Sequence, residues 1–214
     1  MPEIYMLDTA VSDDGVIYKG LQSTWAAARD SVAGSVSTTY PGHAYGVRAS
    51  RTSSRGGGYN YHVYRSFFQF NTRTIHTRPN SCAFFVYGMT NTGARVNCVK
   101  ATAGDNLDAV DFDAIEGWVN GADNGSNVTV YSPEAPSWTI IGYNRFILTD
   151  VALDDMVANN TLQICLLHRS DLRNISPTTD APSGVQFSEY TGTSRDPYLA
   201  YSESTDSVFF GANF

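Results

Sequence analysis

The residue types that most often carry chemistry are few in this chain of 214 residues, and they are widely spaced. The four histidines form no HExxH or similar metal-binding pattern; they are His43, His62, His76 and His168. Asp111, Asp113 and Glu116 are close enough to serve as paired carboxylates in acid–base catalysis. Acidic residues at the start of a helix are, however, an ordinary complement to the helix dipole. We therefore expect no catalytic residues and no enzyme.

The cysteines give no sign of a metal or a cofactor. Cys82, Cys98 and Cys165 form no CxxC pair, have no histidine at ligand spacing, and stand in or beside apolar runs. They predict buried free thiols, which suit a reducing cytosol. The Asp-Asp-Gly turn at residues 13–15 offers a calcium ion too few oxygen ligands. We expect neither metal nor cofactor.

The charge balance argues against several classes of partner. The formal net charge of −7 predicts no general affinity for nucleic acid or anionic membranes, because phosphate binding needs concentrated positive charge. The first residues lack a signal-peptide pattern, and no apolar run approaches the roughly eighteen residues of a membrane span. Six arginines nevertheless concentrate within about thirty residues: Arg48, Arg51, Arg55, Arg65, Arg73 and Arg78. They either lie on solvated faces or, with Arg48, Arg51 and Arg55, form a patch that docks an acidic protein.

Strands are the main elements that must position these residues. From residue 59 to 75, aromatic and apolar residues alternate with polar ones, which predicts a long, half-buried central strand. The alternation changes parity near Arg65 and Ser66, as expected for a bulge or for a stretch covered on both faces. The run Thr161–His168 is almost continuously apolar, so both of its faces should be covered.

The rest of the chain predicts more strands and little helix. Residues 82–88 and 94–101 predict a hairpin across Asn91, Thr92 and Gly93. Short helices are expected around residues 111–118 and 151–156, the second capped by Thr149 or Asp150. About ten strands and two helical turns predict an all-β protein, an antiparallel two-sheet jelly-roll sandwich.

A series of segments supports this fold by resemblance; they are Tyr64–Thr72, Cys82–Tyr87, Arg145–Leu167, Ser188-Glu189 and Arg195–Leu199. In this order they resemble a jelly-roll module of phage virion proteins and bacterial surface proteins, akin to carbohydrate-binding β-sandwiches. The family's first motif usually has Asp and Ser where this chain has Asn71 and Arg73, so a charge-dependent role at that corner does not carry over. The resemblance covers about residues 13–202.

The resemblance implies a division of the chain and a role. Residues 1–12 are expected to be an arm or edge strand, residues 13–202 the sandwich, and residues 203–214 a tail. The implied role is a virion structural protein assembled in the host cytoplasm, most specifically a capsid decoration (cement) protein that stabilises the capsid lattice. Its implied partners are the major capsid protein or other virion proteins, together with copies of itself in a homotrimer.

The tail adds a physical argument for docking. Phe209, Phe210 and Phe214 each forgo about 1.5 to 3 kcal/mol if they stay in water. They should therefore pack under the domain's own sheet or on a neighbouring subunit. Phage structural proteins often end in a similar sequence, which favours the neighbouring subunit.

The alternative function is a carbohydrate-binding module, or an adhesion protein associated with a tail or fibre. A glycan binder needs exposed aromatic rings that stack on sugars, and Trp25, Trp118 and Trp138 are the candidates. Aromatic residues of a sandwich lie more often in the core, so these tryptophans serve the alternative only if they form an exposed row.

Overall fold

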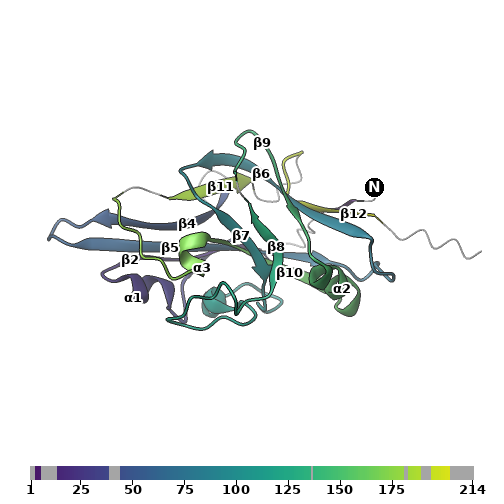
Figure 1. Cartoon of the computed structure of the whole chain (residues 1–214), viewed down its shortest axis with the longest axis horizontal. Helices are drawn as coiled ribbons and strands as arrows, with labels where there is room; N and C mark the ends of the chain where they lie inside the picture. The colour runs from purple at the N-terminus through teal and green to yellow at the C-terminus, as the bar shows by residue number, and fades with distance from the viewer. Residues whose placement is uncertain are drawn as a thin grey trace, which may run out of the picture.

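The protein is predominantly β. The computed structural model describes residues 3–5, 14–38, 44–135, 137–180, 183–188 and 194–202. Within these residues, twelve strands form one antiparallel sheet that nearly closes into a barrel (Figure 1). The strands are β1 (Glu3–Tyr5), β2 (Gly15–Gln22), β3 (Ser35–Ser37), β4 (Ala44–Ser53), β5 (Tyr59–Asn71), β6 (Ser81–Asn91), β7 (Val96–Lys100), β8 (Val130–Ala135), β9 (Gly142–Ile147), β10 (Thr161–His168), β11 (Gly184–Ser188) and β12 (Tyr198–Ser202). The predicted all-β class is confirmed.

The helical elements of the described residues are short. They are α1 (Trp25–Arg29), the 3-10 helix η1 (Ala109–Asp113), α2 (Asp150–Ala158) and α3 (Arg169–Leu172). The helix expected after Thr149 is confirmed as α2, although the Thr149 hydroxyl donates to Val130 O instead of capping the helix. The helix expected over residues 111–118 is wrong in extent, because η1 ends at Asp113 and Gly117 adopts a φ of 80°. No helix in the described ranges is long and apolar enough to cross a membrane.

Strand β5 is central and has three strand partners. Its first half pairs with β4 over residues 59–64, and its second half pairs with β10 over residues 66–71. Strand β2 pairs with β5 over residues 61–67. This arrangement confirms the long central strand and places its side chains against most of the molecule.

The parity change in β5 marks a stretch that is covered on both faces. Side chains from Arg65 to Phe68 are at most 2% exposed. The registers with β4 and β10 show no shift there, so the bulge alternative is wrong. Phe68 packs in the main core and Phe67 in a second core on the opposite face.

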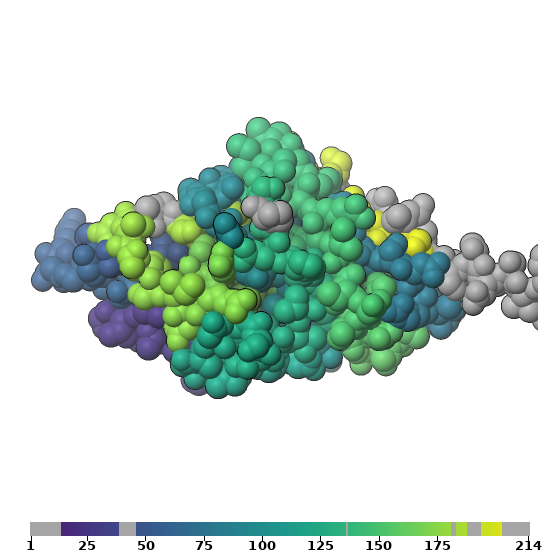
Figure 2. Space-filling view, viewed as in Figure 1, coloured from purple at the N-terminus to yellow at the C-terminus, as the bar shows by residue number. Residues whose placement is uncertain are grey.

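The two cores also lie on opposite faces of β10. Leu162, Ile164 and Leu166 pack in the main core with residues of the surrounding strands and of α2. Cys165 and Leu167 pack in the second core, which α1, η1, α3 and the segment 101–128 cover. In Figure 2 the teal segment around η1 lies on the surface directly below the yellow-green segment around α3. The prediction that both faces of residues 161–168 are covered is confirmed.

Strands β6 and β7 do not form the predicted hairpin. Strand β6 pairs with β9, β11 and β12, whereas β7 pairs with β8 and β10. The turn itself is present, since Asn91 Oδ1 accepts hydrogen bonds from the backbone of Gly93 and Ala94. Val86 of β6 and Val96 of β7 pack in the same core, although their strands have no strand partner in common. The connection therefore passes from one set of strands around this core to another.

Candidate binding sites

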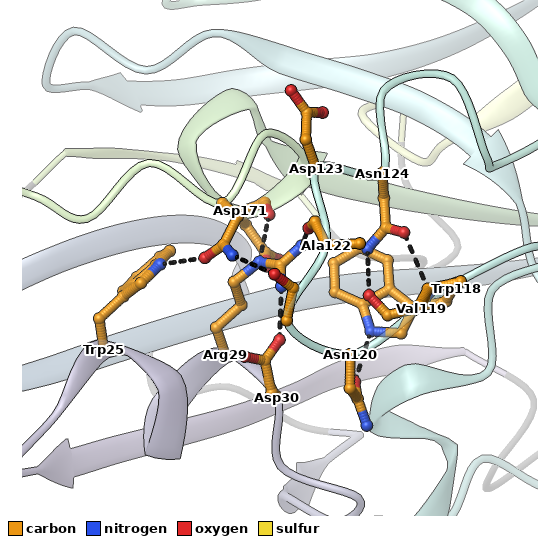
Figure 3. Close-up of polar contacts among 12 residues, drawn as sticks. Trp25, Arg29, Asp30, Trp118, Val119, Asn120, Ala122, Asp123, Asn124 and Asp171 are labelled. Atoms are coloured by element: carbon orange, nitrogen blue, oxygen red, sulfur yellow. Dashed lines mark hydrogen bonds and ion pairs between the residues drawn. The ribbon is translucent and has the colours of Figure 1, made fainter.

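Three charged side chains meet in the second core, all with no exposure: Arg29, Arg65 and Asp171. Arg65 donates from Nε and Nη2 to the two carboxylate oxygens of Asp171, at 2.7 and 2.8 Å. Arg29 Nε lies 3.7 Å from Asp171 Oδ1 and donates to the Asp171 carbonyl at 2.6 Å. Figure 3 shows Arg29 between Asp171 and the segment that carries Ala122.

Main-chain carbonyls and an aromatic ring complete this arginine cluster. Arg65 also donates to Phe112 O and Arg29 O, and Arg29 donates to Ala122 O. Both guanidinium groups lie over the Trp118 ring, at 4.1 and 4.5 Å. Burial lowers the pKa of Arg29, while Asp171 opposes that shift. Arg29 also pairs with Asp30, whose side chain is 15% exposed. The cluster holds β5, α1, α3 and the 114–128 segment together, and its three unexposed charges offer no contact to a ligand.

The three tryptophans do not form a row. Trp25 and Trp118 flank the arginine cluster (Figure 3), and their indole nitrogens donate to Asn174 Oδ1 and Asn120 Oδ1. Trp138 is 7% exposed and packs in the main core. The structure therefore places the three rings in two different layers, without the shared exposed face that sugar stacking on them needs.

Two of the three acidic residues singled out in the sequence have structural partners, and the third, Asp113, is half-buried at the end of η1. Asp111 accepts from the backbone of Asp108 in a capping box at η1. Glu116 lies 3.1 Å from Lys100 Nζ and accepts a hydrogen bond from Thr129. These contacts fix the ends of a loop and do not aim two carboxylates at a common point.

One serine and one histidine lie within hydrogen-bond distance. His168 Nε2 is 2.9 Å from Ser183 Oγ, and His168 Nδ1 accepts from Ser170 N. That acceptor role leaves the neutral ring's proton on Nε2, so the imidazole donates to Ser183 and does not withdraw its proton. The geometry is that of a helix cap. Of the other histidines, His62 lies on β5, His76 is exposed, and His43 lies outside the described residues.

The three cysteines are free and buried, which confirms that prediction. Burial raises the pKa of Cys82 to about 12 and raises those of Cys98 and Cys165. In the described part of the chain, no three His, Cys, Asp or Glu side chains are grouped to hold a metal ion. Asp13 of the proposed turn lies outside it.

The arginines expected at a docking patch lie on and after β4. Arg48 is half-buried beside Tyr64, and its guanidinium lies 5.7 Å from that ring. Arg51 pairs with Asp180 at 3.0 Å and lies over the Tyr59 ring. Arg55 is exposed in the turn before β5. Arg65, by contrast, is buried, so the six neighbouring arginines do not share one patch. The tail residues Phe209, Phe210 and Phe214 lie outside the described residues.

Two cavities on the sheet beside Arg48 share Tyr64 as a lining residue, and together they are called the groove. It consists of a cavity of about 490 Å³ lined by residues of β2, β3 and β5, and one of about 260 Å³ lined by residues of β4, β5, β6 and β11. Tyr64 lines both cavities. Sequence reasoning missed this groove, because its residues come from strands whose pairing the sequence does not display.

A second surface, the aromatic face, lies on β9 and β6 near the top of Figure 1 and on β12 at its right. Phe85 stands opposite Arg145 on one neighbouring strand and Tyr198 on the other, and Tyr87 stands opposite Tyr143. Residues opposite one another in antiparallel strands share a face. The Phe85 and Tyr198 rings stack at 4.8 Å, and the Tyr143 ring contacts both edge to face.

The border of the aromatic face is apolar and basic. The Arg195 guanidinium lies 5.0 Å from the Tyr87 ring. Ile147 is 57% exposed on β9, and Ile141 is 79% exposed in the loop before it. Ile141 has a φ of 58°, which is a strained conformation for a β-branched residue. Strain of this kind concentrates at functional sites, so the loop is a candidate contact point.

Comparison with known proteins adds no family. A scan against protein-family models and a search of curated proteins find no match to this chain.

Proposed function

We propose that this protein is a structural protein of a phage particle, most specifically a capsid decoration protein, which works by adhesion and catalyses no reaction. The observation that carries the proposal is the aromatic face. Tyrosine, phenylalanine and arginine are the residues enriched at the centres of protein interfaces. Here four such rings, each half-buried, share one face of the sheet, with Arg145 on the same face and Arg195 beside the Tyr87 ring.

The fold we propose for this role is of the jelly-roll type. Support comes from β5 and β6, which each change partners along their length. Such changes allow one continuous sheet to bend into two layers around the main core. The resemblance of segments such as Tyr64–Thr72 to the virion module points the same way.

The partner we propose is the major capsid protein or another virion protein, with copies of this chain arranged in a closed homotrimer. Exposed apolar side chains such as Ile141 and Ile147 lose water when they dock, which favours association. The net charge of −7 keeps the remaining surface soluble.

The test begins with particles purified from the phage whose genome carries this gene. Mass spectrometry should find the chain at a fixed ratio to the coat protein, and light scattering should give the mass of a trimer. Particles from a gene deletion should then rebind the purified protein, but not the double variant Arg145→Glu, Ile147→Ser. The control is Val110→Ser, which alters a side chain 65% exposed on η1 and should rebind normally. Absence of the chain from particles would overturn the proposal.

Carbohydrate binding is the second candidate, and the groove is the observation that favours it. The groove combines tyrosine rings with polar side chains, as sugar sites do. A glycan array tests it, and binding that Tyr18→Ala abolishes would support it.

A further inference from the structure

The groove is organised by one row of side chains that crosses the strands. In register, Ser35 of β3 stands opposite Tyr18 of β2, which stands opposite Tyr64 of β5, which stands opposite Arg48 of β4. The Tyr18 and Tyr64 rings stack with centroids 5.1 Å apart and planes 16° apart. Arg48 then follows on the other side of Tyr64. The row therefore joins an aromatic end to a cationic end.

The aromatic end has room for a ring. Tyr64 covers one side of the Tyr18 ring, but the neighbour on the other side is Ser35, which is too small to cover it. The cavity of about 490 Å³ lies here and is lined by both residues. A sugar ring presents C–H groups that stack on such a tyrosine face.

Two further features shape this cavity. A Cβ at Gly20 would come within 2.9 Å of His62 Nδ1, so the glycine permits the imidazole to lie across the cavity floor. Leu21 is 72% exposed at the rim with a φ of 56°, a second strained residue. Strain and a close approach at one cavity are typical of a binding site.

The charges in the groove have one sign. The described residues that line the two cavities include Lys19, Arg48 and His62, and none of them is Asp or Glu. Arg48 supplies the positive charge of the groove, because the Lys19 ammonium donates to Ala33 O and the lowered pKa of His62 favours the neutral imidazole. Arg48 donates to Ser50 Oγ through Nε, which fixes the guanidinium at the edge of the smaller cavity. Burial and then the charge of Arg48 lower the pKa of His62, which favours the neutral imidazole beside the guanidinium.

We propose that the groove binds an acidic oligosaccharide, with one sugar ring stacked on Tyr18 in the larger cavity and a carboxylate of another sugar paired with Arg48 in the smaller cavity. Tyr18 and Arg48 lie two strands apart, about 10 Å, so the ligand needs more than one sugar ring. This inference rests on the second function, carbohydrate binding, and is independent of docking through the aromatic face.

The probes are trigalacturonate, its methyl ester, trisialic acid and hexaglutamate, each titrated calorimetrically into the full chain. An acidic trisaccharide should bind, and the neutral ester at least about tenfold more weakly, because the ester loses a charge-assisted hydrogen bond. Arg48→Gln should reduce that difference to nearly nothing, whereas Tyr18→Ala should weaken acid and ester alike. The matched control is Arg51→Gln, since Arg51 lies on the same strand and pairs with Asp180.

Each contrary result has a distinct meaning. Equal binding of acid and ester would overturn the charge inference and leave carbohydrate binding intact. If hexaglutamate bound more tightly than both acidic sugars, the inference of a saccharide ligand would be overturned and an acidic peptide would be the ligand. No binding of any sugar, on these probes and on a glycan array, would overturn both the inference and the second function. Circular dichroism of each variant should match that of the wild type, which establishes that a loss of binding does not come from a loss of folding.

Discussion

Arg65 and Asp171 form a two-point ion pair in which neither side chain is exposed, with the paired atoms 2.7 and 2.8 Å apart. A charge in a core is stable only when paired and hydrogen-bonded, and here both conditions hold. The pair joins the central strand to α3, so the layer over the second core is attached to the sheet by electrostatics as well as by apolar contact.

Removing one member of this pair should destabilise the fold strongly. Asp171→Asn leaves two buried guanidinium groups facing an amide, and we expect a loss of about 3 to 5 kcal/mol in the free energy of unfolding. Urea denaturation measures it. Arg95→Gln is the control, because its ion pair with Glu134 is partly exposed and should contribute no more than about 1 kcal/mol. Equal effects of the two substitutions would show that the buried pair is dispensable.

His168 should make stability depend on pH. Burial lowers its pKa from 6.5 to about 4. The unfolded chain therefore binds a proton more readily than the folded chain between these values, and stability falls as the pH drops from 6.5 toward 4. At pH 7 this penalty is absent.

The variant His168→Asn isolates that contribution. Asparagine keeps an acceptor for the Ser170 backbone and does not titrate. Thermal unfolding between pH 4.5 and 7.5 should show a flatter curve for this variant than for the wild type. Parallel curves for the two proteins would exclude His168 as the source of the pH dependence.

The cysteines should resist modification while the chain is folded. Only the thiolate reacts with iodoacetamide, and burial raises the pKa of all three thiols. Mass spectrometry should find Cys82, Cys98 and Cys165 unmodified in native buffer and fully alkylated in denaturant. Modification of Cys165 in native buffer would mean that β10 opens, contrary to its complete burial.

Local patterns in the sequence predict single strands well and their neighbours poorly. The apolar run 161–168 and the parity change at Arg65 follow from the two-residue period of a strand, and the structure confirms both. The hairpin across Asn91–Gly93 fails, because a turn signal does not say which layer the next strand joins. The arginine cluster could not be predicted from the sequence, because Arg29 and Asp171 are 142 residues apart and no local pattern indicates that Arg29 is buried.

The groove could not be predicted from the sequence for a related reason. Tyr18, Tyr64 and Arg48 form a row only through the registers of three strands. The tryptophans were predicted as sugar-binding residues because they carry the largest aromatic rings. In the structure these large rings instead pack in and around the two cores.

Ile141 should show a conflict between stability and docking. Its left-handed conformation disfavours a β-branched residue by about 1 to 2 kcal/mol, whereas asparagine tolerates it more readily. Since Ile141 is 79% exposed, Ile141→Asn loses little packing and should raise the free energy of unfolding by about 1 kcal/mol.

If Ile141 contacts the capsid, the same change should weaken rebinding to particles that lack this chain. Leu21→Asn is the matched control, because it relieves a similar φ of 56° away from the aromatic face and should stabilise without affecting rebinding. Unchanged rebinding of Ile141→Asn would remove this loop from the docking surface.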